Sequence, residues 1–276
     1  MDETGGATAT PSNIAATFAP AEAHVTVRDL CLSYGAFVVL HGLNFSVRRG
    51  EIFIVMGPSG CGKSTLLNAM VGLKEPESGD IFYGGVNFTQ ASAEERRALL
   101  QRVGVLFQSG ALWSSMTLAE NVGLPLSEFT RLSPGEVREV ASAKLALVGL
   151  RGFEDYYPAE ISGGMRTRAG LARAMALDPE ILFFDEPTAA LDPISARRLN
   201  DLILELRDSL GATFVVVTHD LTTIFRIGTN SVFIDPTTRT VIASGDPKRL
   251  RAECQDDRVR LFLGSADAAR PGSAHA

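Results

Sequence analysis

The segment GPSGCGKST, residues 57–65, constrains the fold of this chain more than any other. It matches the pattern GxxxxGK[ST], and it lies between EIFIVM, which is typical of a buried strand, and TLLNAMVGL, which is typical of a helix. In such a loop the glycines let backbone N–H groups wrap phosphates, the lysine reaches the β and γ phosphates, and the serine hydroxyl binds Mg²⁺. A glycine-rich turn without a ligand is the alternative, and the flanking strand and helix disfavour it.

Composition limits the other possibilities. The 276 residues allow one large domain or two small ones, and no apolar run approaches the roughly 20 residues needed to span a bilayer. The formal net charge of -6 argues against a nucleic-acid-binding surface, which normally carries a basic excess. Cys31, Cys61 and Cys254 are odd in number and widely spaced, which indicates a reducing, cytoplasmic compartment and no zinc or redox pair.

The chain changes character along its length. Residues 1–23 carry acids and no Lys or Arg, unlike a signal or transit peptide, and we expect them and residues 265–276 to be disordered tails. Short β-like runs fill residues 24–83, and residues 91–175 turn helical. Two fully apolar runs, ILFF and TFVVV, follow, and such runs suit central parallel strands covered on both faces. The pattern predicts an α/β domain with a helical insertion.

A second candidate anion site lies in ISGGMRTRAG, residues 161–170, where a serine and two glycines precede a basic run with helical character. Free N–H groups and the helix dipole favour negative charge at such a helix start, although glycines there can also serve close packing alone. Two phosphate cradles in one chain need an explanation.

The acidic pair Asp185 and Glu186 follows the ILFF run. Open α/β sheets place ligands at strand C-termini, and a magnesium nucleotide needs one carboxylate for the metal and another to activate water. Asp185 suits the metal and Glu186 the base. In isolation such a pair is more often a solvated turn, but a neighbouring phosphate-binding loop favours the nucleotide site.

Four motifs together resemble those of the ATP-binding cassette (ABC) ATPases. GPSGCGKST, ISGGM, ILFFDEPTAALD and VVVTHD look like the Walker A, signature, Walker B with D-loop, and H-loop motifs, in that order and spacing. The resemblance covers nearly all of residues 24–246. It implies a P-loop NTPase fold of the ABC type, with an antiparallel β subdomain, a mainly parallel central sheet and a helical signature subdomain at about residues 110–175. Residues 247–264 would form a C-terminal helical extension.

The resemblance also implies ATP hydrolysis with ATP and Mg²⁺, and it assigns roles to single residues. Glu186 matches the general base, His219 the histidine that contacts the γ-phosphate, and Gln108 the Q-loop glutamine. Tyr34 matches the aromatic residue that stacks on adenine. The implied metal-binding residues are Ser64, Gln108 and Asp185. The other implied ATP-binding residues are Gly57, Pro58, Ser59, Gly60, Cys61, Gly62, Lys63, Ser64 and Thr65.

In that family the signature loop faces the ATP of the other protomer, which would explain the second phosphate cradle. The residues implied to act in trans are Ser162, Gly163, Gly164 and Met165. Asp192 matches the D-loop aspartate that communicates between the two sites. This signature departs from the common LSGGQ: Ile161 keeps an apolar anchor, whereas Met165 lacks an amide that could hydrogen-bond near ribose or phosphate.

Several of these residues have ordinary alternatives. On residue type alone, the tyrosine at position 34 would be a packing residue of a strand, a loop glutamine would carry no meaning, and a lone histidine would be structural. Cys61 also stays open. A thiol at a helix N-terminus tends to have a lowered pKa and to be reactive, but the residue could equally be an inert small side chain.

The region between the Q-loop and the signature narrows the resemblance. LFQSGALWSSMTLAENVGLPL, the SGGM signature and the late DDRVRLFLG look like the ATPase subunits of phospholipid transporters of the Mla type and their Mce-associated relatives. This implies a homodimer at the cytoplasmic face of the inner membrane, bound to an integral-membrane permease and to lipid-binding or accessory subunits, without nucleic acid. Trp113 and Met116 would lie near the groove for a permease helix, or they would only pack the helical insertion.

Three other functions compete. The first is an ABC transporter ATPase for another substrate. The second is a soluble ABC protein that clamps nucleic acid, but such proteins usually carry a long coiled coil or two cassettes, and this acidic chain has neither. The third is another P-loop NTPase such as a GTPase, which would leave ISGGM unexplained, and no NKxD-type guanine motif is present.

Overall fold

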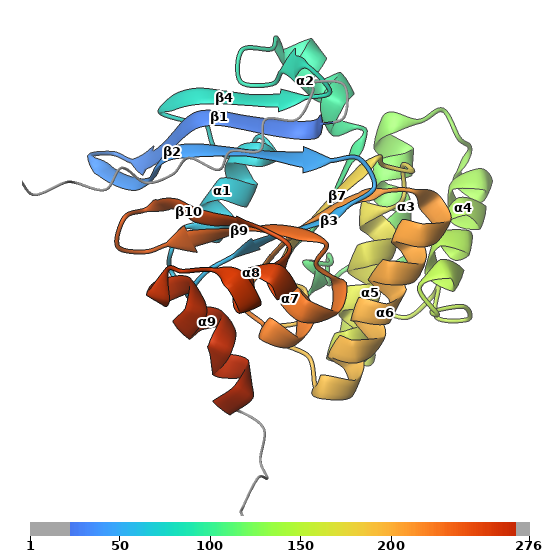
Figure 1. Cartoon of the computed structure of the whole chain (residues 1–276). Helices are drawn as coiled ribbons and strands as arrows, with labels where there is room; N and C mark the ends of the chain where they lie inside the picture. The colour runs from blue at the N-terminus through green and yellow to red at the C-terminus, as the bar shows by residue number, and fades with distance from the viewer. Residues whose placement is uncertain (1–22, 269–276) are drawn as a thin grey trace, which may run out of the picture.

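The structure is a computed structural model that describes residues 23–268, and the side chains of residues 23–264. The expectations for residues 1–22 and 269–276 lie outside this part of the chain. Two sheets with a helix between them form the centre of the molecule (Figure 1). The strands of the larger sheet are β3 (Ile52–Met56), β6 (Val103–Leu106), β7 (Ile181–Asp185), β8 (Thr213–Thr218), β9 (Asn230–Asp235) and β10 (Thr240–Gly245).

The larger sheet has the strand order β10-β9-β3-β8-β7-β6. Its neighbours are parallel except for β9 and β10, which are antiparallel. Both faces of this sheet are covered: Ile52 and Ile54 pack into one hydrophobic core, whereas Phe53 and Val55 pack into the other. This two-sided burial explains why its strands are continuously apolar.

The smaller sheet is antiparallel, with the order β2-β1-β4-β5. Its strands are β1 (Ala23–Tyr34), β2 (Phe37–Arg48), β4 (Ser78–Tyr83) and β5 (Val86–Asn87). Helix α1 (Lys63–Met70) lies between the two sheets (Figure 1), and its Leu66 and Leu67 are fully buried in the core that they share. The start of α1 is thereby fixed between two sheets.

Helices cover the other face of the larger sheet. Three of them pack on one another as a helical subdomain: α3 (Leu118–Phe129), α4 (Pro134–Leu147) and α5 (Gly163–Ala174). Capping boxes at Thr117 and Ser133 satisfy free N–H groups at the starts of α3 and α4. The remaining helical segments outside the C-terminal region are α2 (Ala93–Leu100), η1 (Gln108–Gly110), η2 (Pro158–Glu160), α6 (Pro193–Leu210) and α7 (Leu221–Ile227). The expected architecture, with an antiparallel β subdomain, a mainly parallel central sheet and a helical subdomain, is confirmed.

The C-terminal region consists of α8 (Pro247–Glu253) and α9 (Asp257–Ala268). Helix α9 continues past residue 264, where the sequence predicts a tail to begin. Val259 and Leu263, one turn apart, are fully buried and fix the helix against the domain. In the described part of the chain, no helix combines the length and the apolar composition needed to cross a bilayer.

Candidate active site

Residues 57–62 form the connection between β3 and α1, with Gly62 as the N-cap of the helix, and residues 63–65 form the first turn of α1. Gly57 has a φ of 152°, and a Cβ at this position would lie 2.5 Å from the carbonyl oxygen of Ile234. Gly62 has a φ of 101°, and its Cβ would meet two apolar side chains of β2 at 2.9 Å. Glycine is required at both points, and the first N–H groups of α1 have no partner within the helix. The loop has the form of an anion cradle.

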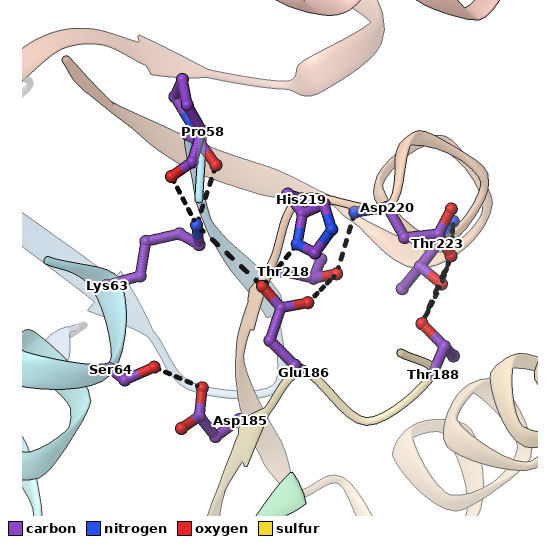
Figure 2. A network of polar contacts seen from close by, with 11 residues as sticks. Pro58, Lys63, Ser64, Asp185, Glu186, Thr188, Thr218, His219, Asp220 and Thr223 are labelled. Carbon is purple, nitrogen blue, oxygen red and sulfur yellow. Dashed lines mark hydrogen bonds and ion pairs between the residues drawn. The ribbon is translucent and has the colours of Figure 1, made fainter. Parts of the chain in front are cut away.

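Lys63 is buried inside this loop. Its Nζ donates hydrogen bonds to the carbonyl oxygens of Gly57 and Pro58, at 2.8 and 2.9 Å. The same atom lies 4.0 Å from Glu186 Oε1 (Figure 2). The loop thus holds an ammonium group at its centre, and phosphate oxygens are chemically suited to take the place of the carbonyl oxygens.

Ser64, in the first turn of α1, and Asp185, the last residue of β7, point toward one another (Figure 2). Ser64 Oγ donates a 2.9 Å hydrogen bond to Asp185 Oδ1. Burial raises the pKa of Asp185, the Ser64 hydrogen bond opposes this, and the neighbouring Glu186 adds to it. A hydroxyl and a carboxylate are the oxygen ligands that Mg²⁺ takes. Gln108, the third residue expected here, is exposed at the start of η1, directly after β6, the strand that pairs with β7.

Glu186 follows β7 with a left-handed backbone, φ 47°, which is uncommon for a residue other than glycine. Its N–H donates to the carbonyl oxygen of Val217 at 2.9 Å. One carboxylate oxygen, Oε1, lies 2.7 Å from His219 Nδ1, and the other accepts a 3.1 Å hydrogen bond from Thr218 Oγ1 (Figure 2). The structure therefore brings together two predicted residues, Glu186 and His219, and adds Thr218, which the sequence reasoning missed.

A second set of hydrogen-bonded polar side chains lies beside Glu186 and His219 and extends into α7. Thr188 Oγ1 lies 3.3 Å from Asp220 Oδ2, which also accepts a 2.6 Å hydrogen bond from Thr223 Oγ1 (Figure 2). Asn200 of α6 donates to Thr223 at 3.0 Å. These contacts tie the loop after Glu186 to α6 and α7. No local sequence signal identifies them, because their members come from separate segments.

The signature residues begin α5. Ser162 is the N-cap of this helix, and its Oγ accepts a 3.3 Å hydrogen bond from the N–H of Met165. A Cβ on Gly164 would lie 3.2 Å from Ser195 Oγ, and Ser195 is bonded to Asp192, the N-cap of α6. The predicted signature and D-loop residues are thus neighbours. Their helices belong to the core on one face of the larger sheet, whereas α1 belongs to the core on the other face.

Tyr34 lies at the end of β1 and is 58% exposed, and Lys74 Nζ lies 4.1 Å from its ring centroid. An exposed ring face is suited to stacking on a base. Cys61, by contrast, is buried, and burial raises the pKa of its thiol, with Lys63 opposing the rise. The geometry favours the inert interpretation of Cys61 over the reactive one.

Comparison with known proteins gives consistent matches. A protein-family model described as "ABC transporter" matches residues 40–189. The intermembrane phospholipid transport system ATP-binding protein MlaF of Escherichia coli K12 is 40% identical over 248 residues, which cover 90% of this chain and 91% of that protein. The probable ribonucleotide transport ATP-binding protein mkl of Mycobacterium tuberculosis H37Rv is 42% identical over 202 residues, 73% of this chain and 56% of that protein. The chain therefore matches little more than half of the length of mkl.

Two solved structures share the fold. The ATP-binding cassette MJ0796, solved as a dimer in a post-hydrolysis state bound to ADP and Pi, has a TM-score of 0.73 and 30% identity, over 80% of this chain and 97% of that one. The protein cbiO1 of Clostridium perfringens, part of the ABC transporter complex cbiONQ, has a TM-score of 0.76 and 27% identity, over 90% and 98% of the two chains. The family match and the fold agree that this chain is an ATP-binding, ATP-hydrolysing subunit, and that it belongs to the ABC transporter family.

Proposed function

We propose that this chain powers a transporter that moves phospholipids or related lipids between membranes and so maintains the lipid organisation of the cell envelope. The observation that carries this proposal is the match to MlaF, which extends over 91% of the length of that protein. The match to mkl, whose name refers to ribonucleotides, extends over 56% of its length. Coverage of the whole protein therefore favours lipid over ribonucleotide as the substrate class.

The catalytic proposal assigns each group by its position. Glu186 is the general base, because its carboxylate is held between Thr218 and His219 at the end of β7. Lys63 binds the β and γ phosphates, and the N–H groups of residues 57–65 wrap them. Ser64, Asp185 and Gln108 hold Mg²⁺, which when bound would neutralise charge on the phosphates. His219 orients Glu186 and reaches the γ-phosphate, and Tyr34 stacks on adenine.

The dimer proposal rests on the placement of the two helix starts. Helices α1 and α5 pack into cores on opposite faces of the larger sheet. We therefore assign the signature residues to the ATP of a second copy, with Asp192 at the boundary between the two sites. MJ0796, which resembles this chain, was solved as a dimer, and this supports the assignment.

A cavity of about 670 Å³ is the proposed docking site of the permease at the cytoplasmic face of the inner membrane. Residues of α2, β6 and α3 line it together with Trp113, which is 59% exposed. The buried amide of Asn121 bonds both the N–H and the carbonyl oxygen of Trp113 and so fixes its backbone. Met116 does not line the cavity, so only Trp113 keeps its proposed role there.

The test is purification of the chain with its native membrane partners, followed by mass spectrometry of the bound proteins and lipids. The proposal predicts an integral-membrane permease, accessory subunits and co-purified phospholipid. It also predicts that ATP hydrolysis by the complex responds to phospholipid in the surrounding bilayer and not to added ribonucleotides other than the ATP substrate. A permease complex that carries ribonucleotide and no lipid would contradict the lipid assignment but leave the ATPase assignment intact.

A further inference from the structure

The turn that follows β9 has a buried carboxylate at its base. Asp235 is the last residue of β9, and among residues 23–264 it is the only acidic residue that is buried. Its Oδ2 accepts hydrogen bonds from Thr238, from N–H at 2.7 Å and from Oγ1 at 2.8 Å. The third donor to this oxygen is Arg258 Nη1 of α9, at 2.9 Å. One oxygen atom therefore connects the turn to α9.

The guanidinium of Arg258 bonds two carboxylates. Besides Asp235, its guanidinium bonds the carboxylate of Asp256, at 3.0 Å from Nε and 2.6 Å from Nη2. The helix that carries it is packed against the domain: Val259 is fully buried, and the ring of Phe262 lies 5.1 Å from that of Phe233 on β9. Helix α9 and the end of β9 thus form one rigid unit.

This unit forms a wall of the phosphate-binding loop. A Cβ on Gly57 would lie only 2.5 Å from the carbonyl oxygen of Ile234, the residue directly before Asp235. The turn and the start of the loop are thus close backbone neighbours, and a shift of the turn would be passed on to the loop.

The same turn also contacts β2, the strand whose side chains lie next to Gly62 of the phosphate-binding loop. Arg239, with a φ of 54°, donates from Nη1 to the carbonyl oxygen of Val38 at 2.7 Å, and its carbonyl oxygen accepts the N–H of His41 at 3.0 Å. Its guanidinium lies 4.6 Å from the ring centroid of Phe37, the cross-strand partner of Tyr34. The turn after β9 therefore links α9 both to the phosphate-binding loop and to the β1–β2 hairpin, which carries Tyr34, the residue expected to stack on adenine.

We propose that Arg258 and Arg239 are positioning residues for ATP binding: they hold the turn after β9 against the phosphate-binding loop and against the β1–β2 hairpin. The proposal rests on the assignment of residues 57–65 as the ATP phosphate loop. Neither arginine is assigned a contact with nucleotide. The catalytic carboxylate lies at the end of β7, on the other side of β3 and β8, so these arginines act on affinity and not on the chemical step.

The experiment measures KM and kcat for ATP, and ATP affinity by calorimetry, on the full chain. Arg258→Met keeps the aliphatic stem and removes the charge, and it should raise the KM for ATP about five- to twentyfold with kcat within about twofold of the wild type. Arg258→Lys keeps one donor for Asp235 and should restore most of the affinity. Arg260→Met is the matched control, because Arg260 is an exposed arginine of the same helix that pairs only with Asp257 among its recorded partners, and it should leave KM unchanged.

Arg239→Ala tests the turn independently of α9 and should also raise KM without lowering kcat. If thermal unfolding shows that Arg258→Met is not folded, the KM of Arg239→Ala alone tests the proposal. A folded Arg239→Ala or Arg258→Met with an unchanged KM, or with a lowered kcat at constant KM, overturns the proposal. Lys63→Ala distinguishes a failure of the phosphate-loop assignment from a failure of the positioning role. If Lys63→Ala also leaves ATP affinity unchanged, the assignment of the phosphate loop is wrong. If Lys63→Ala weakens ATP binding and the arginine variants do not, only the positioning role is wrong.

Discussion

Thr218 Oγ1 donates a 3.1 Å hydrogen bond to Glu186 Oε2, although Thr218 ends β8 and Glu186 follows β7. The same hydroxyl accepts the N–H of Asp220 at 3.0 Å, so its proton is directed towards the carboxylate. Thr218 is fully buried and therefore cannot exchange this partner for bulk water. The pair fixes one oxygen of the proposed general base and leaves the other beside His219.

Thr218→Val tests this contact with a side chain of nearly the same shape. Loss of the hydrogen bond should let the Glu186 carboxylate rotate, and kcat should fall about tenfold, the effect of roughly 1.4 kcal/mol, while the KM for ATP stays constant. Steady-state kinetics on the purified chain measures both parameters. Thr222→Val, on the exposed side of α7, is the matched control. An unchanged kcat in folded Thr218→Val would mean that the threonine is only structural.

Glu186→Gln should remove the group that activates water. Turnover should fall by roughly 10² to 10⁴, whereas ATP should still bind and a nucleotide-trapped dimer should accumulate. Glutamine can still accept the Thr218 hydrogen bond, so the fold of the site is preserved. Glu205→Gln, an exposed site on α6, is the control for the loss of one charge. Hydrolysis near the wild-type rate in Glu186→Gln would refute the role of the general base.

Cys61 should resist alkylation in the folded chain. Its thiol is buried and burial raises its pKa, so little thiolate is exposed to reagent. Cys31 and Cys254 are partly exposed and should be modified first. Mass spectrometry of the labelled peptides, with ATPase activity followed in parallel, provides the measurement. Inhibition that MgATP prevents, and that is lost in Cys61→Ser, would show that the thiol is reactive after all.

His24 should make stability depend on pH. Burial, followed by Arg49, lowers its pKa from 6.5 to about 4, and it contacts Thr213 at 2.7 Å. The unfolded chain therefore binds this proton more readily, and between about pH 7 and pH 5 the contribution of His24 to unfolding free energy should fall by about 2 kcal/mol. Below about pH 4 the contribution is fully lost. Denaturant unfolding of the wild type and of His24→Gln at both pH values measures it, and equal pH dependence in the two proteins would contradict the assignment.

The sequence predicts the architecture well because its strongest signals are local. The glycines at positions 57 and 62 are needed by the backbone path itself, and the continuous apolar strands reflect a sheet buried on both faces. The order of the motifs limits the fold further, because few topologies are compatible with these four motifs in this order along the chain. These signals require no knowledge of which distant residues meet.

The sequence fails where long-range contacts decide. The sequence leaves Cys61 open between a reactive and an inert thiol, and burial in the folded domain favours the inert one. The partnership of Thr218 with Glu186 joins segments that are far apart along the chain. In each case burial, which a single sequence reveals poorly, sets the outcome.

Mixed dimers test whether the signature of each copy acts on the ATP of the other. Lys63→Ala damages the phosphate loop, and Ser162→Arg fills the signature and removes the N-cap of α5. If each site joins two chains, one lesion in each chain concentrates both defects in one site, whereas both lesions in one chain damage both sites. Turnover can require two working sites, so nucleotide occlusion is the better readout.

Tagged, purified mixed dimers, with Glu186→Gln in every chain to block hydrolysis, are loaded with MgATP, and the occluded nucleotide is counted. The wild-type loop and signature in the same Glu186→Gln background give the reference occupancy, and thermal unfolding of each variant verifies its fold. The account predicts about one occluded ATP per dimer when the lesions are split between the chains, and close to none when both lie in one chain. The opposite ranking would show that the signature serves its own chain, and it would contradict the proposed dimer.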